Sequence, residues 1–199
     1  MGFTKVCREE IRKREIMSRR TKRLDISSMT KIALLTALLS ISSYLIIPLP
    51  FTPIVLSMHT VIVNVIGLVL KPSHAAYTIL VYLFMGLIGL PVFSAGSAGP
   101  AKLFGPTGGF YFGFLFAVIV ISLCKGKRNR FMRYAFVTIG LGVPIQHICA
   151  ILFMCFYNGF QIQTAIVTIS LPFLLGDVFK CIVACMLGVK VNRIEYHIM

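Results

Sequence analysis

The chain has 199 residues, of which 57% are hydrophobic and 13% are charged, and its mean hydropathy is +0.88. Soluble domains use about 45–50% apolar residues, so this composition excludes a soluble globular domain and indicates an integral membrane protein. The net charge of +14 would indicate nucleic-acid binding in a soluble protein, but here the basic residues lie at the ends of apolar stretches. Membrane topology and contact with lipid explain that placement, and we predict no nucleic-acid partner.

Residues 1–31 form a basic segment that differs from the rest of the chain. They hold ten lysine or arginine residues and contain no long apolar run. The basic region is too long for a secretory signal, and no cleavage-type sequence follows the first apolar stretch. We therefore predict a cytoplasmic N-terminal tail that contacts membrane lipid.

Six apolar stretches follow this tail, and each is close to the ~20 residues that a membrane-spanning helix needs. Short segments rich in proline, glycine and lysine separate them. We predict an all-α integral membrane protein, in which a bundle of six transmembrane helices forms one substrate-binding domain over residues 32–193, before a cytoplasmic tail at 194–199. The predicted spans cover residues 32–49, 54–70, 74–93, 108–124, 131–157 and 164–189.

The basic residues predict the orientation of these helices, because positively charged loops stay on the cytoplasmic side. With the N-terminus in the cytoplasm, 18 of the 20 lysine and arginine residues lie on the inner side. Lys102 then faces outside and Lys180 lies within the membrane. We therefore expect cytoplasmic N- and C-termini in a multi-pass protein of the plasma membrane.

Two of the predicted helices carry polar residues that we expect to face the interior of the bundle. A single buried histidine is usually a packed and hydrogen-bonded residue, but Gln146 and His147 can also line a cavity. Tyr82 and Phe93 are candidates to stack against a ligand, although aromatic side chains serve equally often in packing. The polar residues are Ser57, His59 and Asn64 in the second stretch, and Gln146 and His147, beside Pro144, in the fifth.

The segment at residues 94–109 contains five glycines and two prolines, which we expect to prevent helix formation. Irregular backbone near the membrane must be buried in protein or line a cavity, so its N–H groups become donors for a ligand. The start of the fourth helix favours an anionic group. The segment lacks the Gly-Lys-Ser/Thr ending of a nucleotide-binding loop, and an ordinary outer loop remains the alternative. The candidate ligand contacts are Gly96, Ser97, Thr107, Gly108 and Gly109.

Asp177 and Lys180 are charged residues near the middle of the last apolar stretch. Three residues apart on a helix, both side chains lie on one face. A charge at bilayer depth costs on the order of 2.5–3.5 kcal/mol on insertion scales, so such residues are usually functional. The pair suits a polar ring that carries a carbonyl acceptor and N–H donors. A structural ion pair that locks two helices is the alternative.

The remaining motifs indicate neither a metal site nor a catalytic site. The six cysteines include no C-x-x-C pair, and no two histidines lie at ligand spacing, so we predict free thiols and no metal. No nucleophile–base pair is evident, so we predict no catalytic residues and no cofactor. Ala33 and Ala37 lie four residues apart on the first helix and suit either a docking surface for another helix or contact with lipid.

Three sequence blocks, in this order, resemble the BioY family, the biotin-specific S-component of energy-coupling factor (ECF) transporters. They are GLIGLPVF at residues 86–93, FGPTGGF at residues 104–110 and PFLLGDVFK at residues 172–180, and PFTP at residues 50–53 is similar to that family too. The resemblance covers about residues 29–193. Residues 1–28 extend beyond the usual family start, and Gln146 and His147 differ from the family pattern.

This resemblance implies a six-helix protein that captures biotin from the outer face and works with a transmembrane coupling subunit and an ATPase pair. Asp177 and Lys180 match the family residues that bind biotin, whose ureido ring carries the carbonyl and N–H groups inferred above. The carboxylate of biotin would lie near the glycine-rich loop, with Lys102 as its suggested partner. Ala33 and Ala37 match the face that docks on the coupling subunit.

Three other functions remain open at the level of the sequence. The first is a stand-alone or proton-coupled small-molecule carrier that uses Asp177 and His147 and needs no ATPase partner. The second is a small membrane enzyme, which would need a catalytic pair or metal cluster within the bundle. The third is a structural or assembly subunit, which would bind no small molecule.

Overall fold

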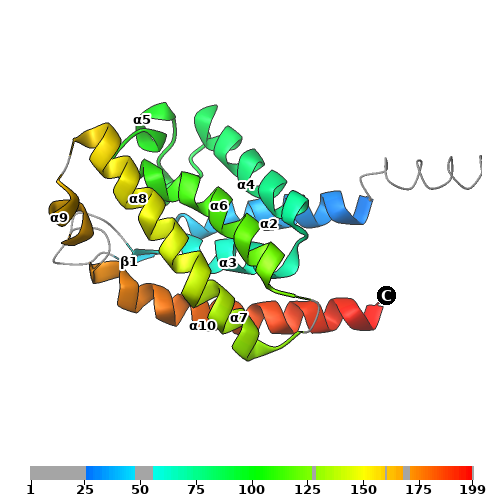
Figure 1. Cartoon of the computed structure of the whole chain (residues 1–199). Coiled ribbons are helices and arrows are strands. Elements are labelled where there is room, and N and C mark those ends of the chain that lie inside the picture. The colour runs from blue at the N-terminus through cyan, green and yellow to red at the C-terminus, as the bar shows by residue number, and fades with distance from the viewer. Residues whose placement is uncertain (1–25, 48–55, 127–128, 160, 168–170, 199) are drawn as a thin grey trace, which may run out of the picture.

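The computed structural model describes residues 26–47, 56–126, 129–159, 161–167 and 171–198. They form a bundle of helices with a two-residue antiparallel strand pair, β1 (Ile46–Ile47) and β2 (Leu56–Ser57). The start of α2 and the end of α10 lie at the same end of the bundle, and β1 and α9 lie at the other end (Figure 1). The helices are α2 (Ile26–Ser42), α3 (His59–Val69), α4 (Pro72–Leu87), α5 (Pro100–Leu103), α6 (Gly108–Cys124), α7 (Phe131–Val137), α8 (Val143–Asn158), α9 (Ile162–Ala165) and α10 (Leu171–Ile198).

These helices follow the predicted apolar stretches in order, and α6 has the predicted bounds. Other bounds differ: α2 begins at Ile26, inside the predicted tail, and ends at Ser42, and α10 continues to Ile198. Within the described residues, one helix is long and apolar enough by itself to cross a membrane, at Phe131–Tyr157 with a hydropathy of 1.9. α2, α3 and α6 are shorter apolar helices.

The outer surface of the bundle is apolar, as expected for a protein in contact with lipid. Large hydrophobic side chains point outward on several helices, including Met132, Phe136, Phe156 and Phe179, which are 70–96% exposed. Polar side chains such as His59, Asn64 and Asp177 are buried in the interior together with apolar ones. Large exposed apolar side chains over a partly polar interior are expected where the surrounding solvent is hydrocarbon.

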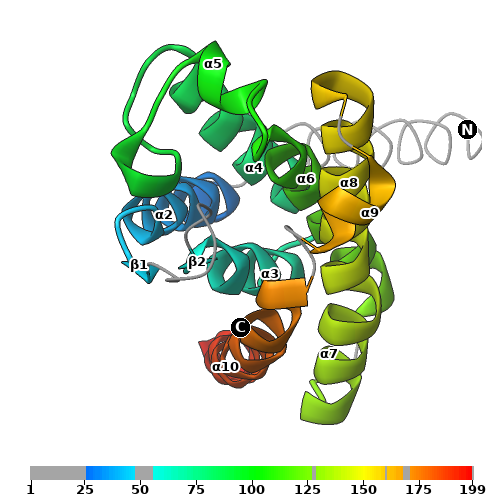
Figure 2. The same ribbon diagram turned by 90° about the vertical axis from the view of Figure 1, so that its left-hand side faces the viewer.

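α3 lies at the centre of the bundle, next to α2, α4, α6 and α10 (Figure 2). It buries His59, Thr60 and Asn64 along with its apolar residues. The prediction that the polar residues of this stretch face the interior is therefore confirmed for His59 and Asn64, whereas the side chain of Ser57 lies outside the described residues. Gln146 and His147 are likewise buried, as predicted.

Pairs of contacts fix the relative direction of the helices. α3 and α10 run parallel, because Thr60 contacts Asp177, Asn64 contacts Cys181 and the carbonyl of Leu68 accepts from Asn192. α6 and α8 run antiparallel, because Gly109 lies against Ala150 and Gly113 lies against Gln146. These directions are those of helices that alternate through a membrane in chain order.

A π-helical turn joins α7 and α8 into one long helix. This turn, η2 (Thr138–Gly142), ends where the N–H of Val143 donates to the carbonyl of Thr138, five residues earlier. Pro144 follows in the first turn of α8 and has no N–H to donate. The changed hydrogen-bond register allows the helix to continue past the proline, which faces outward.

The prediction that residues 94–109 contain no helix was wrong. They form a 3₁₀ turn, η1 (Ser94–Gly96), and the short helix α5. Pro100 begins α5 because its fixed φ suits the first helical position, where a missing N–H costs nothing. Many backbone donors here are already bonded: for example, the N–H of Ala95 donates to Ser43, and that of Gly99 donates to Gly86.

The bundle end near residues 68–71 is tied together by side chains. Lys125 Nζ donates to the carbonyl oxygens of Leu68 at 2.9 Å and Leu70 at 2.6 Å. Ser122 Oγ also donates to Leu70, at 2.6 Å. Asn192 Nδ2 donates to the carbonyl oxygen of Leu68 at 3.1 Å. These contacts satisfy carbonyls that the end of α3 leaves unpaired, and they connect it to α6 and α10.

Glycines allow the close approach of α6 and α8. A Cβ at Gly109 would lie 2.6 Å from Phe153 Cβ, 2.7 Å from Ala150 Cα and 2.8 Å from the carbonyl oxygen of Cys149. Gly113, four residues on, also lies close to α8, where a Cβ would be 3.0 Å from Gln146 Cα. Small residues at this spacing let two backbones pack directly, which is a main source of helix association in membranes.

We predict that Gly109→Ala lowers the stability of the protein by about 1–3 kcal/mol, because α6 and α8 must separate to make room for the methyl group. Gly140→Ala is the matched control, since no atom lies within 4 Å of a Cβ there. Thermal unfolding of the detergent-purified variants, followed by size-exclusion chromatography, measures the effect. Equal melting temperatures for the two variants would contradict the assigned packing role.

Candidate functional site

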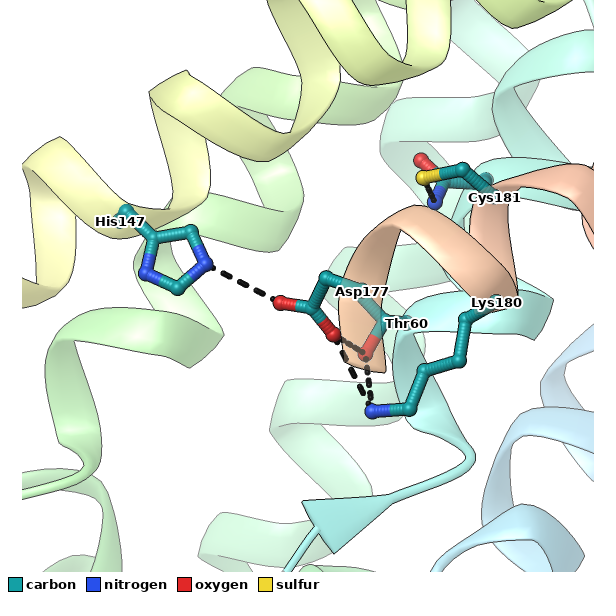
Figure 3. Close-up of polar contacts among 6 residues, drawn as sticks. Thr60, His147, Asp177, Lys180 and Cys181 are labelled. Atoms are coloured by element: carbon teal, nitrogen blue, oxygen red, sulfur yellow. Dashed lines mark hydrogen bonds and ion pairs between the residues drawn. The ribbon is translucent and has the colours of Figure 1, made fainter. Parts of the chain in front are cut away.

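Asp177 and Lys180 form a buried ion pair on α10. Lys180 Nζ lies 3.1 Å from Asp177 Oδ1 (Figure 3). Asp177 is 4% exposed and Lys180 is 5% exposed. The predicted placement of both side chains on one helix face is confirmed. Because both charges come from the same helix, however, this pair by itself locks no two helices together.

Two further side chains connect the ion pair to other helices. Thr60 Oγ1, from α3, lies 3.4 Å from Asp177 Oδ1 and 3.4 Å from Lys180 Nζ. Its hydroxyl donates to the carboxylate and accepts from the ammonium. His147 Nε2, from α8, lies 3.0 Å from Asp177 Oδ2 (Figure 3). The carboxylate of Asp177 therefore joins α3, α8 and α10.

The hydrogen bonds around Asp177 and Lys180 offset the free-energy cost of burying two charges. An isolated ion in a medium of low polarity is expensive, and a pair is stable only with good geometry and with its remaining hydrogen-bonding groups satisfied. Both carboxylate oxygens of Asp177 have partners, on opposite sides of the group. The result is a fixed acceptor beside a fixed donor, a pattern that can exchange partners with a ligand carrying N–H and carbonyl groups.

A second polar cluster surrounds Tyr82. Its hydroxyl lies 2.8 Å from His59 Nε2 and donates to the carbonyl of Val92 at 2.9 Å. Phe93 packs edge-on against Tyr82, with ring centroids 5.7 Å apart. The ring centroid of Tyr111 lies 4.6 Å from that of Phe93. Tyr82 and Phe93 are both 0% exposed, so both candidates for stacking on a ligand lie in a packed aromatic cluster.

The loop candidates lie at the end of the bundle where α4 ends and α6 begins. Ser97 Oγ donates to the carbonyl of Ser94 at 2.7 Å. Gly96 has φ +67 and faces the ring of Tyr44, and Tyr44 in turn donates to the carbonyl of Pro91 at 2.8 Å. These contacts hold the loop against the end of α2.

The candidates at the start of α6 serve in packing. Thr107 is the N-cap residue of α6, but its side chain makes no capping hydrogen bond. Gly108 is buried against the backbone of Leu103, and its N–H already donates to the carbonyl of Gly105 at 2.9 Å. Gly109 contacts α8. The close approach of helices is thus the role that the geometry gives to these glycines.

Gln146 is 1% exposed, and its Nε2 has no hydrogen-bond partner among the described residues. It precedes His147, which contacts Asp177. The tertiary structure therefore brings Asp177, Lys180 and His147 together and leaves the side-chain donor of Gln146, one residue away, available.

Sequence reasoning missed Thr60 as a partner of the ion pair. One signal for it was available: Thr60 and Asn64 lie four residues apart in an apolar stretch, so they share a helix face. The contact between His147 and Asp177 had no such signal, because it joins residues 30 positions apart.

The described residues contain no group of three histidine, cysteine or acidic side chains that could hold a metal ion. The cysteines in this part of the chain, Cys124, Cys149, Cys155, Cys181 and Cys185, are free thiols. Cys7 lies outside the described residues.

Ala33 and Ala37 lie on the exposed face of α2. The residues that follow them, Leu34 and Leu38, line an apolar groove of about 520 Å³ between α2, α3 and α10. This groove is separate from the residues that surround Asp177.

Comparison with known proteins places the chain in a family. A model of the BioY family matches residues 17–196. The chain belongs to the BioY family. The "Biotin transporter BioY2" of Lactococcus lactis subsp. cremoris is 32% identical over 170 residues, which cover 85% of this chain and 92% of the relative. The "Biotin transporter BioY" of Thermotoga maritima is 31% identical over 84% of this chain and 96% of the relative.

A solved structure supports the fold of this BioY family member. The crystal structure described as the S-component for biotin from an ECF-type ABC transporter superposes with a TM-score of 0.77. It is 23% identical and covers 84% of this chain and 92% of the other. The chain therefore has the fold of a known membrane protein, and family membership agrees with its apolar outer surface.

We predict that Lys180→Met lowers stability by about 3 kcal/mol, because it leaves the Asp177 carboxylate buried without its ammonium partner. The double variant Asp177→Asn/Lys180→Met should lose less stability than Lys180→Met alone, because no charge of the pair then remains buried without a partner. Apparent melting temperatures in detergent, without ligand, measure both effects. Lys190→Met, at an exposed lysine of the same helix, is the control.

If Lys180→Met melts at the wild-type temperature, the pair does not stabilise the bundle. Additive losses in the double variant would show instead that Asp177 and Lys180 act independently.

Proposed function

We propose that this protein captures biotin on the outer side of the plasma membrane and delivers it to the cytoplasm as the S-component of an ECF-type transporter. The observation that carries this function is the buried Asp177–Lys180 pair in a chain of the BioY family. Relatives of the chain that are named as biotin transporters supply the substrate. It is a transport subunit and not an enzyme.

The chemistry of the pair suits the ureido ring of biotin. The ring offers a carbonyl oxygen and two N–H groups, and the pair offers an ammonium donor and a carboxylate acceptor. In the structure Lys180 and Thr60 contact Asp177 Oδ1, and His147 contacts Oδ2. Biotin binding replaces part of these contacts, so little hydrogen bonding is lost in the buried site.

Further contacts are proposed around this centre. The unpartnered Nε2 of Gln146 donates to the ligand. Gly96, Ser97 and Thr107, at the loop end of the bundle, close over the site and receive the carboxylate, with Lys102 as a basic neighbour. Tyr82 contributes to the wall of the site through its cluster. For Gly108 and Gly109 we propose an indirect role, in which they hold α6 against α8.

The same proposal includes six membrane spans with cytoplasmic N- and C-termini. Two independent features support it: the alternating directions of the packed helices and the basic residues near the inner ends of the predicted spans. Lys71, Lys125, Lys190 and Arg193 then lie on the inner side, and the loop at residues 94–107 lies on the outer side.

We assign the docking of the coupling subunit to the exposed face of α2. Ala33 and Ala37 leave room for another helix to approach, and the apolar groove beside them accepts large side chains of that helix. ATP hydrolysis by the ATPase pair then acts through this contact. Lipid contact by the basic N-terminal tail helps to hold the protein at the inner surface.

A proton-coupled carrier is the second candidate function, and the 3.0 Å contact between His147 and Asp177 favours it. A histidine beside a buried carboxylate can exchange a proton during transport. Such a carrier takes up substrate without an ATPase and stops when the proton gradient is dissipated. Uptake through an S-component instead stops when its ATPase is inactivated, and it continues without the proton gradient as long as ATP is present.

We predict that detergent-purified wild-type protein binds labelled biotin, and that Asp177→Asn and Lys180→Met each weaken binding by about 10–100-fold. This factor corresponds to the ~1.5–3 kcal/mol of a hydrogen bond to a charged group. Equilibrium dialysis at low temperature, on monodisperse fractions, measures the dissociation constants. Lys190→Met should bind as wild type does.

Wild-type protein that fails to bind biotin would overturn the assigned substrate. If wild type binds and both variants keep its affinity, the site lies elsewhere in the bundle.

For energy coupling we predict that Ala33→Trp leaves biotin binding intact and abolishes uptake, because the large ring blocks the approach of the coupling subunit. Leu152→Trp, at a position 62% exposed on α8, is the matched control and should transport normally. Uptake of labelled biotin by cells that express the whole transporter measures both. Normal uptake by Ala33→Trp would remove this face from the proposal.

A further inference from the structure

Four buried side-chain atoms of the described residues have no hydrogen-bond partner, and two of them belong to sequence neighbours of the groups that contact Asp177. These two are His59 Nδ1 and Gln146 Nε2. Each belongs to a residue next in sequence to a partner of Asp177: His59 precedes Thr60, and Gln146 precedes His147. Leaving such an atom unpaired costs about 1–3 kcal/mol, so a site that keeps two of them is prepared for a ligand that satisfies them.

The hydrogen bonds around Tyr82 determine what His59 Nδ1 can do. Tyr82 has a single hydroxyl proton, and it donates this proton to the carbonyl of Val92 at 2.9 Å. The 2.8 Å contact between the hydroxyl oxygen and His59 Nε2 is then a hydrogen bond only if Nε2 carries the proton and donates. In a neutral imidazole protonated at Nε2, Nδ1 is a bare acceptor.

The surroundings of His59 favour this neutral ring. Among the described residues, the rings of Tyr82, Tyr111 and Phe114 pack around it, and the Val92 backbone is its hydrogen-bonding neighbour. The ionised group that acts on it electrostatically is the ammonium of Lys180. An imidazolium would be a buried cation facing another cation, which is an expensive arrangement. In a neutral ring protonated at Nε2, Nδ1 is a hydrogen-bond acceptor that can bind a donor.

The position of His59 links this acceptor to the ion pair. His59 is the first residue of α3 and is 0% exposed. The adjacent residue, Thr60, contacts both Asp177 and Lys180. His59 thus packs among the aromatic rings and is adjacent in sequence to the residue that bonds both charges, so a ligand ring held at Asp177 and Lys180 has a buried acceptor one helix position away.

We propose that His59 is a specificity-determining residue whose Nδ1 accepts a hydrogen bond from an N–H group of the bound ligand. This inference rests on the proposed function and extends it. In a cyclic urea, one N–H donates to Asp177, the carbonyl accepts from Lys180, and the second N–H donates to His59. The site thereby selects rings with two N–H groups over rings in which one nitrogen is blocked.

The first test compares the dissociation constants of biotin for the wild-type protein and for the His59→Phe variant. Phenylalanine keeps the ring and its packing but removes the acceptor, and Tyr82 keeps its bond to Val92. We expect affinity to fall by at least about 10-fold, the equivalent of one buried hydrogen bond. His59→Gln, which restores a carboxamide acceptor, should recover most of the affinity. The control is Thr78→Val, since Thr78 is also 0% exposed and bonds within its own helix.

The second test reads the effect of biotin on the wild-type protein, and a variant serves only to identify the resonance. The chain has four histidines, so side-chain nitrogen NMR of ¹⁵N-histidine-labelled wild type resolves each ring, with His59 identified from the His59→Gln spectrum. The Nδ1 resonance of His59 should be that of a bare acceptor without ligand and should shift when biotin saturates the protein. A buried water at Nδ1 would give the same resonance with and without biotin.

Two results would overturn the role of His59 and leave the proposed function standing. The first is that wild type binds biotin and the Nδ1 resonance does not shift. The second is that wild type binds biotin and the dissociation constant of His59→Phe is within twofold of the wild-type value. If wild type itself does not bind biotin, the proposed function fails first. A further check uses biotin methylated on one ureido nitrogen: wild type should discriminate against one of the two methylated forms more strongly than His59→Phe does.

Discussion

The burial of one carboxylate determines how the centre of this protein is built. Asp177 is buried, so side chains must satisfy its charge, and these come from three helices: Thr60 on α3, His147 on α8 and Lys180 on α10. Each helix must therefore keep its position relative to the other two. The cost of an unpaired buried charge fixes this part of the bundle more strictly than the packing of apolar side chains does.

The rest of the bundle provides the rigidity that this centre needs. Gly109 and Gly113 bring α6 and α8 into backbone contact, which places His147. At the opposite end, Lys125 and Asn192 tie the last turn of α3 to α6 and α10, which fixes the distance between Thr60 and Asp177. In a membrane, where apolar packing against lipid is nearly as favourable as packing against protein, such close contacts and polar ties hold helices together.

Much of the fold followed from the sequence, because hydrophobic length and charge placement are local properties. The apolar stretches, the buried polar faces of α3 and α8 and the bounds of α6 are all present as predicted. Errors occurred where one residue type has two roles. Pro100 was expected to break a helix and instead begins α5. The ligand contacts expected for Gly108 and Gly109 stay a prediction; the structure adds that both glycines lie against other helices.

The sequence by itself determined that the chain is a membrane protein of the BioY family and that Asp177 and Lys180 share a helix face, because composition, motif order and helical period require no knowledge of distant contacts. Only the tertiary structure decided which groups surround that pair. Thr60 and His147 lie 117 and 30 residues from Asp177 along the chain. The acceptor role inferred for His59 Nδ1 depends on the contact of His59 Nε2 with the Tyr82 hydroxyl, which forms only when α3 and α4 pack.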